Sequence, residues 1–343
     1  MKAAKVYVKM KNIALIYFTG DSDKGANEVR NNILFRGDIR ANFGNIIRLL
    51  FGIFQKLKRA FKGSSSVIEK KIEIDSNLGV YIIKLPIKLS KLNKSRKFVR
   101  NKAEKLICKI CMEKSIDRCI VPTHLKVVLK NCKKSSFTGN ITYNVLGELI
   151  LKDICEKKGY NIREIDIAVI QGEDDVLPYI VIKLLSPIVK FITLVTNYRE
   201  KMNNKLEELC DDTGLSVRIT NDVESVLENC DLVINYGNVK SSNMNNKIKS
   251  KAIVINYGEF EDTLLEDKNT VINGIDIDLG KKYLDGFEKD IYKFYSPIEI
   301  AEIILTSKFH KCINSLYDLA DYIVVDSFKN NFLEEGFLIK GYL

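Results

Sequence analysis

The residues with the clearest chemical potential follow an apolar run in the second half of the chain. Residues 165–170 are apolar and of strand length, and the segment Gln-Gly-Glu-Asp-Asp-Val-Leu-Pro follows at 171–178. After the first strand of a dinucleotide domain, such a segment binds pyrophosphate through glycines and a helix N-terminus. Here Gly172 is its one glycine, and three acids at 173–175 would repel the anion. These acids either cap a helix or ligate a metal that bridges to phosphate.

A second group follows the apolar run at 191–195. Asn197 and Arg199 lie where a Rossmann domain binds the adenosine ribose, and an arginine there can pair with a 2′-phosphate. The alternative is an arginine in the first turn of a surface helix. Both residues therefore belong to a candidate cofactor-binding set.

Two further runs end alike. Residues 233–237 and 254–258 both read Val-Ile-Asn-Tyr-Gly. If both are parallel strands, Tyr236 and Tyr257 lie at the same sheet edge, near the ligand crevice. The alternative is two buried strands with glycine turns. The predicted cofactor-binding residues are Gly172, Asn197, Arg199, Tyr236 and Tyr257.

Metal chemistry has little support. Cys108 and Cys111 form one short-spaced pair, whereas a structural zinc site usually combines two such pairs. Because the two cysteines share one face of a predicted helix, we expect buried free thiols. We predict no metal site.

The elements that position these residues alternate between strand and helix. The apolar runs are continuous rather than alternating, which is typical of parallel strands buried on both faces. The predicted strands are 165–170, 191–195, 215–219, 231–235 and 252–256. The predicted helices are 142–158, 178–185, 199–212 and 223–228. This order predicts a doubly wound, Rossmann-like sheet. In the first half, strands at 13–18 and 79–86 and a helix at 95–113 are expected.

Length and composition agree with a folded α/β protein. The chain has 343 residues, enough for about two domains, with 46% hydrophobic and 29% charged residues. This balance excludes a disordered or collagen-like chain. We found no signal peptide and no apolar run of about 18 residues. We therefore expect a cytoplasmic protein with reduced thiols, and its abundance of Lys, Ile and Asn suggests a bacterial source.

The formal charge is +10, and the basic residues are spread over the first half. Residues 44–62 combine apolar side chains with five Lys or Arg and no acid, which predicts a basic amphipathic helix. Such a helix binds an anionic membrane surface or an acidic carrier protein, or it packs on its own core. No recognised nucleic-acid motif is present, so specific nucleic-acid binding is not expected.

Several short segments in a fixed order carry a family resemblance. They are Phe137-Thr-Gly-Asn-Ile-Thr-Tyr143, Gly159-Tyr-Asn-Ile162, Glu299-Ile-Ala-Glu302 and Glu335-Gly-Phe337. Over about residues 70–340 the chain resembles the long-chain acyl-[acyl-carrier-protein] reductases, which are aldehyde-forming relatives of the shikimate dehydrogenase-like Rossmann proteins.

The resemblance implies NADPH as hydride donor and a cysteine that accepts the acyl group as a thioester. The family's loop glycines align with other residues here: Gln171, Asp174 and Leu177. Its cysteine aligns with Glu299, while Ala301 and Glu302 match the family. A carboxylate would form an anhydride instead of a thioester, so Glu299 is a catalytic candidate with altered chemistry. His124 is the other candidate, because it lies near a loop that in the family adjoins the substrate pocket.

We therefore expect an N-terminal α/β domain at 1–140, including the basic helix 44–62, and a Rossmann-like domain at 141–296. Helices at 297–343 are expected to pack back across the cleft. The leading hypothesis is a divergent relative of the reductases without thioester chemistry, acting as a ligand-binding or regulatory protein. One alternative is an active NAD(P)H-dependent oxidoreductase that holds NADPH through Arg199. Another is a peripheral membrane-surface scaffold.

Overall fold

The computed structural model describes residues 11–19, 67–88, 97–125, 134–135, 137–173, 176–239, 248–260, 269–287, 289–309, 313, 318 and 322–343. The chain divides into two compact units. Unit 1 comprises Met1–Ser136 with Lys289–Phe294, and unit 2 comprises Phe137–Glu288 with Tyr295–Leu343. The domain boundaries predicted from the sequence follow residues 140 and 296. The predicted helix at 44–62 lies outside the described residues.

Unit 1 is built on a five-stranded sheet of order β2-β3-β1-β4-β5. The strands are β1 (Lys11–Thr19), β2 (Val67–Asp75), β3 (Leu78–Lys88), β4 (Arg118–Ile120) and β5 (Lys134–Ser135). All neighbours pair in parallel except β2 and β3. Residues 13–18 of β1 are buried on both faces, which explains the continuous apolar run. Helix α3 (Lys97–Glu113) buries Ala103, Ile107 and Ile110 at helical spacing.

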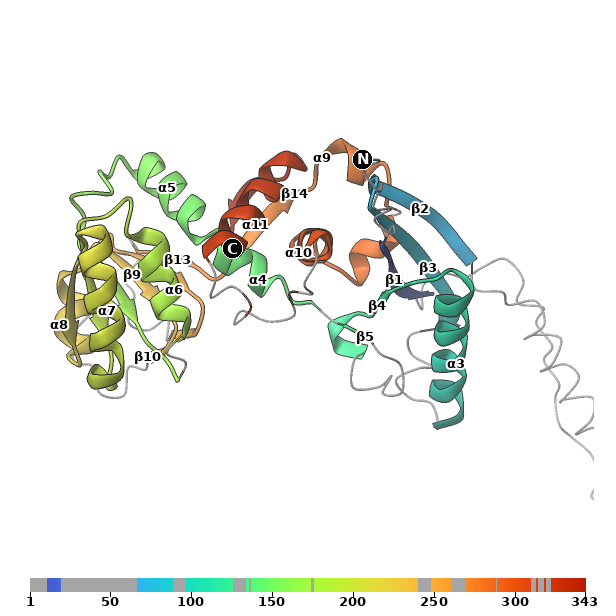
Figure 1. Cartoon of the computed structure of the whole chain (residues 1–343), viewed down its shortest axis with the longest axis horizontal. Helices are drawn as coiled ribbons and strands as arrows, with labels where there is room; N and C mark the ends of the chain where they lie inside the picture. The colour runs from blue at the N-terminus through green and yellow to red at the C-terminus, as the bar shows by residue number, and fades with distance from the viewer. Residues whose placement is uncertain are drawn as a thin grey trace, which may run out of the picture. The chain divides into compact units, whose positions relative to one another are not determined.

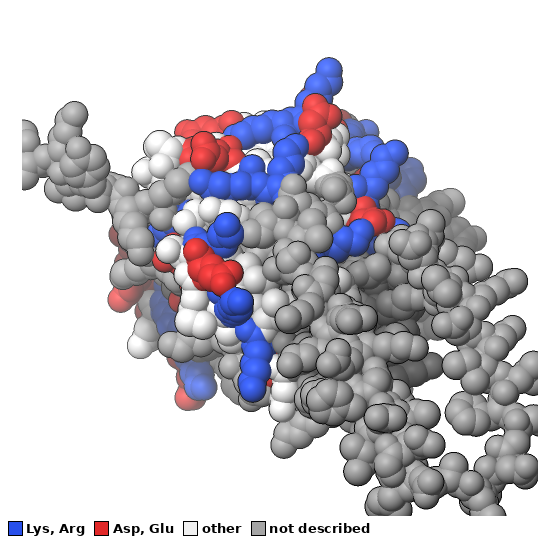
Figure 2. Space-filling model, turned by 90° about the vertical axis from the view of Figure 1, so that its right-hand side faces the viewer, with Lys and Arg blue, Asp and Glu red and all other residues white. Residues whose placement is uncertain are grey.

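Charges in unit 1 are mixed rather than of one sign. The face drawn in Figure 2 has basic side chains beside acidic ones. Four of the described unit 1 lysines have nearby acids: Lys71 with Glu73 at 3.0 Å, Lys109 with Glu113 at 3.6 Å, and Lys84 and Lys293 with Asp290 at 3.1 and 2.6 Å. On the face drawn in Figure 2, the described basic side chains are therefore interspersed with acids.

Unit 2 contains a six-stranded, fully parallel sheet of order β13-β11-β9-β6-β7-β8. The strands are β6 (Ile167–Ile170), β7 (Phe191–Val195), β8 (Ser216–Thr220), β9 (Leu232–Asn235), β11 (Ile253–Asn256) and β13 (Thr270–Ile272). Numbered along the chain, the spatial order is that of a Rossmann sheet, with its switch point between β6 and β9. The predicted α/β class with a doubly wound sheet is confirmed.

Helices cover both faces of this sheet. The chain supplies α5 (Gly147–Lys158), α6 (Val176–Leu185), α7 (Arg199–Thr213) and α8 (Val223–Asn229). Ala168 and Ile170, which alternate along β6, pack in one cluster with Val226 and Leu227 of α8. Helix α6 contacts β6 and lies between α5 and α7 (Figure 1).

The single helix predicted at 142–158 is two helices. Helix α4 spans Asn140–Val145, and α5 begins at Gly147. Leu146 separates them with φ −80° and ψ 2°, outside helical geometry. Helix α4 buries residues 141–145, and α5 buries Ile150, Leu151, Ile154 and Cys155, so apolar residues continue through the break and the sequence pattern did not reveal it.

The rest of unit 2 surrounds α10 (Pro297–Lys308), which packs on α4, α11 (Tyr322–Glu334) and β14 (Ile275–Asp278). The tail predicted to be helical ends in a strand, β15 (Leu338–Tyr342), which pairs antiparallel with β14. Further short elements are β10 (Asn238–Val239), β12 (Glu259–Phe260) and α9 (Gly280–Leu284).

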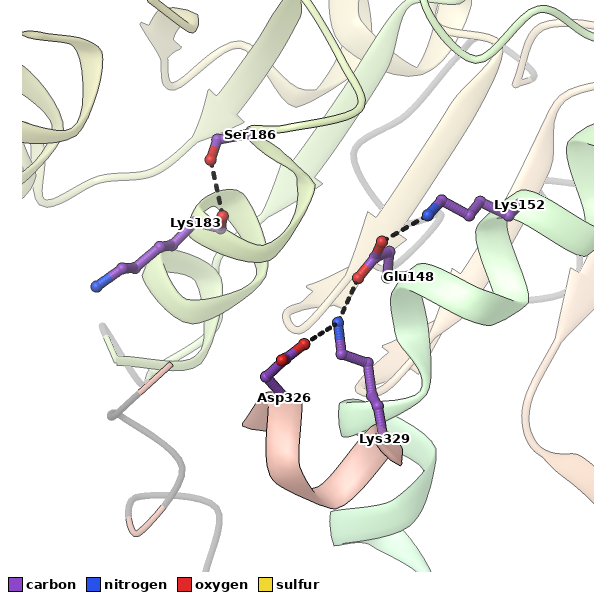
Figure 3. Close-up of polar contacts among 6 residues, drawn as sticks. All are labelled: Glu148, Lys152, Lys183, Ser186, Asp326 and Lys329. Atoms are coloured by element: carbon purple, nitrogen blue, oxygen red, sulfur yellow. Dashed lines mark hydrogen bonds and ion pairs between the residues drawn. The ribbon is translucent and has the colours of Figure 1, made fainter. Parts of the chain in front are cut away.

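An ion-pair network joins α5 to α11 in unit 2 (Figure 3). The Glu148 carboxylate accepts from Lys152 at 2.7 Å and from the buried Lys329 at 2.6 Å. Lys329 also lies 3.5 Å from Asp326. Burial raises the pKa of Glu148. The hydrogen bonds and charges of the two lysines lower it by more than burial raises it, so the pKa lies below its usual value. The network links α5 to α11 within unit 2.

No helix among the described residues is long and apolar enough to cross a membrane.

Candidate functional site

The carboxyl ends of the unit 2 strands form an open pocket of about 570 Å³. Residues 171–173 follow β6, residues 196–198 follow β7, residues 236–238 follow β9 and residues 257–258 follow β11. These four segments line the pocket. Since ligands of open α/β sheets bind outside the carboxyl ends at the switch point, this is the expected place for a site.

The loops meet by close backbone approach at the switch point. A Cβ atom added to Gly172 would lie closer than 3.0 Å to the carbonyl oxygen of Tyr236. One added to Gly258 would come equally close to Gly237. Glycine is required at both positions because no side chain fits between the two backbones.

Three tyrosines pack together beside this contact, two of them stacked and the third tilted by 46°. The rings of Tyr236 and Tyr257 lie 4.8 Å apart with an interplanar angle of 11°, and Tyr143 lies 4.4 Å from Tyr257. The Tyr236 hydroxyl donates to Asn144 Oδ1 at 3.0 Å, and the Tyr143 hydroxyl donates to the carbonyl of Ile272 at 2.8 Å. Burial raises the pKa of Tyr257 well above its usual value, so it stays protonated at neutral pH.

A row of asparagines joins the ends of three neighbouring strands. Asn235 Nδ2 donates to Asn256 Oδ1, and Asn256 Nδ2 donates to Asn273 Oδ1, both at 2.8 Å. Asn235 is fully buried and also accepts from the backbone of Gly237 at 3.1 Å. The repeated Asn-Tyr-Gly segments therefore share one arrangement, in which the asparagines link the strands and the tyrosines stack.

Gln171 differs from these satisfied groups. Its Nε2 and Oε1 atoms are both buried, and neither has a hydrogen-bond partner among the described residues. Glu173 is the one charged side chain among the described lining residues, and it is exposed. The described pocket wall thus contains no lysine or arginine.

Four of the five predicted cofactor-binding residues line this pocket: Gly172, Asn197, Tyr236 and Tyr257. The fifth, Arg199, is exposed at the first position of α7 and is not among the lining residues. Whether any of them binds a cofactor remains a prediction.

The catalytic candidate Glu299 takes part in a capping box at the start of α10. Its Oε2 accepts from the Ser296 backbone at 2.7 Å and from the Ser296 hydroxyl at 3.0 Å. In return, the Glu299 backbone N–H donates to Ser296 Oγ at 3.4 Å. This arrangement is a local stabilising motif, and the carboxylate is engaged in it.

Glu302, which matched the family pattern, caps a different helix. Its side chain is 1% exposed and accepts from the backbone N–H groups of Thr138 at 3.3 Å and Thr142 at 3.1 Å. Burial raises the pKa of Glu302 above its usual value, and the N–H groups around Thr138–Thr142 oppose that rise. The Thr-Gly-Asn segment and the Glu302 segment therefore meet in space, as a helix N-terminus and its internal carboxylate.

Other chemical candidates are few in the described part of the chain. His124 lies in a 3₁₀ turn, Thr123–Leu125, and its side chain is outside the described atoms. The described free cysteines do not line the pocket, and burial, the largest cause, raises the pKa of Cys230 to about 11. Among these residues, no group of three or more His, Cys, Asp or Glu could hold a metal.

The described lining differs from that of a dinucleotide site. A pyrophosphate needs glycines that leave room for it, or cations that pair with it. Here the space beside Gly172 is taken by the Tyr236 carbonyl, and the one charged lining residue, Glu173, is an acid. The orphan amide of Gln171 is a neutral donor and acceptor, which suits an uncharged ligand better than a dianion.

Sequence reasoning missed two features of the site. Gln171 was treated only as a missing glycine, although its place directly after the first strand was a signal for a recognition residue. Asn144, which holds the Tyr236 hydroxyl, lies on α4, and nothing in the local pattern links it to β9.

No protein-family model and no curated protein matches the chain. Solved structures with some similarity include ornithine carbamoyltransferase from Pyrococcus furiosus, at 12% identity and TM-score 0.31, covering 77% of this chain and 79% of that one. L-tryptophan dehydrogenase from Nostoc punctiforme matches at 12% identity and TM-score 0.32, covering 74% and 76%.

Shikimate 5-dehydrogenase from Listeria monocytogenes, in complex with shikimate and NAD, matches at 10% identity and TM-score 0.29, covering 86% of this chain and 96% of that one. These similarities are too weak to support an argument about function. The class of this protein, a divergent Rossmann-like α/β protein, follows from its own sheet order. The resemblance to acyl-[acyl-carrier-protein] reductases remains a prediction.

Proposed function

We propose that this chain is a Rossmann-like binding or regulatory protein whose pocket takes an uncharged, hydrogen-bonding small molecule instead of a dinucleotide. The observation that carries the proposal is the open pocket at the switch point, whose described walls hold polar and aromatic side chains but no cation. A volume of about 570 Å³ lies within the usual range for small-molecule sites.

The loop geometry supports the loss of dinucleotide binding. Gly172 serves a backbone contact with Tyr236 and is therefore unavailable as a phosphate cradle. Glu173 adds a negative charge where a pyrophosphate would lie, and like charges at short range in a partly desolvated site repel strongly.

The loss of thioester chemistry has separate support. Glu299 replaces the expected cysteine, and its carboxylate is bound by Ser296. A capped carboxylate is a weak acyl acceptor, and among the described lining residues there is no thiol to replace it. The remaining role for the pocket is binding.

Calorimetric titration with NADPH and NADH, with and without magnesium, tests the proposal. We expect no heat and no thermal stabilisation at millimolar nucleotide. Micromolar NADPH binding that is lost in Arg199→Ala would contradict the proposal and favour the oxidoreductase alternative. Glu200→Ala, at the neighbouring exposed position of α7, serves as the matched control.

The partner predictions depend on residues 44–62, so we keep them as a separate proposal. Pelleting with vesicles of anionic lipid at low salt tests the membrane-surface scaffold, and neutralising Lys56, Lys58 and Arg59 should weaken it. An acidic carrier protein in place of vesicles tests the alternative partner.

A further inference from the structure

Gln171 lines the pocket from a position that is held by its backbone. It directly follows β6, and its backbone N–H donates to the carbonyl of Val195 at 3.0 Å. Its own carbonyl oxygen lies 3.1 Å from the place that a Cβ atom on Gly237 would take. The backbone of Gln171 is therefore held by the strand ends on both sides, and only its side chain can adjust.

The amide of this side chain is unsatisfied. Both of its polar atoms are buried without a hydrogen-bond partner among the described residues. A buried donor or acceptor without a partner loses its hydration and gains nothing in return, which destabilises the folded state. An apolar residue of similar size, such as leucine, would avoid this loss. A glutamine here is explained if a ligand supplies the missing partners.

The neighbouring polar groups are already paired within the protein. The Asn235 and Asn256 amides bind each other at 2.8 Å, and the Tyr236 hydroxyl donates to Asn144 at 3.0 Å. The Tyr257 hydroxyl donates to the Tyr143 carbonyl at 3.4 Å. The Asn197 and Asn238 amides also line the pocket but are exposed to solvent, so Gln171 is the described lining residue whose amide is buried without a partner.

The chemistry of an amide defines its complement. A carboxamide offers one acceptor and one donor side by side in a plane, so the best partner is a planar edge with a donor beside an acceptor. Nucleobases and lactams have such edges. The described walls contain no cation to pair with a phosphate, and the acid Glu173 disfavours one. Partly exposed rings of Tyr198 and Tyr236 can pack on a flat ligand.

We propose that Gln171 is the specificity-determining residue of this pocket and that the ligand is an uncharged ring with an amide-type edge, a nucleobase or a lactam, which the Gln171 side chain turns to meet. This inference rests on the proposed function, since it names the ligand class of the same pocket.

Calorimetry on the full chain tests the ligand class. The probes are uridine and adenosine as nucleosides, 2-pyrrolidinone and nicotinamide as a lactam and a carboxamide, and UMP and AMP as the charged counterparts. We expect binding of at least one neutral probe, and at least a tenfold weaker affinity for its 5′-phosphate where the probe is a nucleoside. Tighter binding of a nucleoside than of 2-pyrrolidinone identifies the ligand as a nucleobase, and the reverse order identifies it as a lactam. No binding of any neutral probe at 10 mM would overturn the inference.

The variant Gln171→Leu tests the role of the amide. Its expected signature has two parts: at least a tenfold loss of affinity for the bound probe, and a thermal midpoint raised by about 2 °C in the free protein, because a buried unpaired amide is removed. Asn256→Leu is the matched control, since its amide is paired on both sides and its loss should lower the midpoint.

The outcomes separate the two proposals. A Gln171→Leu protein that is less stable than the parent, or that binds the probe as tightly, overturns the role of Gln171 and leaves the proposed function standing. Micromolar NADPH binding overturns both.

Discussion

Two loops in unit 2 each contain a single glycine and lead toward a helix, and both could in principle receive an anion. At the start of α4, the N–H groups of Thr138 and Thr142 bind the buried Glu302 carboxylate. In the loop before α6, Gly172 instead contacts the backbone of Tyr236, and Glu173 faces solvent. The N–H groups of the first loop are thus occupied by the Glu302 carboxylate, whereas the close backbone contact at Gly172 leaves the second loop without room for an anion.

The comparison teaches that a segment resembling a family motif can have a structural role. The Thr-Gly-Asn segment and Glu302 satisfy each other inside the core, where an unpaired group is costly. The phosphate loop has no such internal partner. Gly172 of this loop packs against the backbone of Tyr236, and the Gln171 amide is buried without a partner among the described residues.

The largest expected effect is at the first loop. Glu302→Ala removes the buried carboxylate and leaves the N–H groups of Thr138 and Thr142 unpaired, so the free energy of unfolding should fall by about 3 kcal/mol. Urea unfolding measures it. Glu299→Ala is the matched control on the same helix, and its loss should be near 1 kcal/mol because only a local cap is removed. Equal losses of stability in Glu302→Ala and Glu299→Ala would contradict the assignment of Glu302 as the internal anion of the first loop.

The next effect concerns the second loop. Gly172→Ala places a methyl group against the Tyr236 carbonyl, and the loops must separate, which should lower the free energy of unfolding by about 2 kcal/mol. Gly341→Ala, which has no atom within 4 Å of the new methyl, should be close to neutral. An unchanged midpoint in Gly172→Ala would show that the loop is open enough for a phosphate.

A smaller effect is expected when the stack loses a hydroxyl. Tyr236→Phe keeps the ring on Tyr257 but removes the hydrogen bond to Asn144, so unfolding should become easier by about 1 kcal/mol. Tyr198→Phe, on the exposed side of the pocket, is the control. Thermal unfolding of both variants provides the measurement, and a larger loss in Tyr198→Phe would contradict this assignment.

The smallest effect is in pH dependence, and its sign distinguishes two buried carboxylates. The pKa of Glu302 is raised above its usual 4.5, so its contribution to stability is full below pH 4.5 and is lost as pH rises through the folded value. The pKa of Glu148 is lowered, so its contribution is present above pH 4.5 and is lost as pH falls. The measurement is the free energy of unfolding of Glu302→Gln and Glu148→Gln between pH 3 and 8. Glu302→Gln should remove a decrease in stability with rising pH, and Glu148→Gln should remove an increase.

The sequence predicted five of the six sheet strands of unit 2 and the helices between them within one or two residues at most ends, because buried parallel strands and helix stops are local patterns. It did not predict the edge strand β13. It placed Tyr236 and Tyr257 at one sheet edge from a repeated segment alone. It did not predict the break at Leu146 or the strand at the tail, since both depend on what packs against them. It also gave no structural role to Glu299, although the Ser-Pro-x-Glu pattern of a capping box was present.

By itself, therefore, the sequence determined the five strands β6, β7, β8, β9 and β11 of the doubly wound sheet in unit 2 and the residues that end each of them. Only the tertiary structure decided which of those residues meet. Glu302 binds Thr138 across 164 positions of the chain, and the Tyr236 hydroxyl binds Asn144 across 92. Such pairs leave no local pattern, because their geometry is set by the strand order and by helix packing. The same folding that pairs them leaves the Gln171 amide buried at the pocket without a described partner.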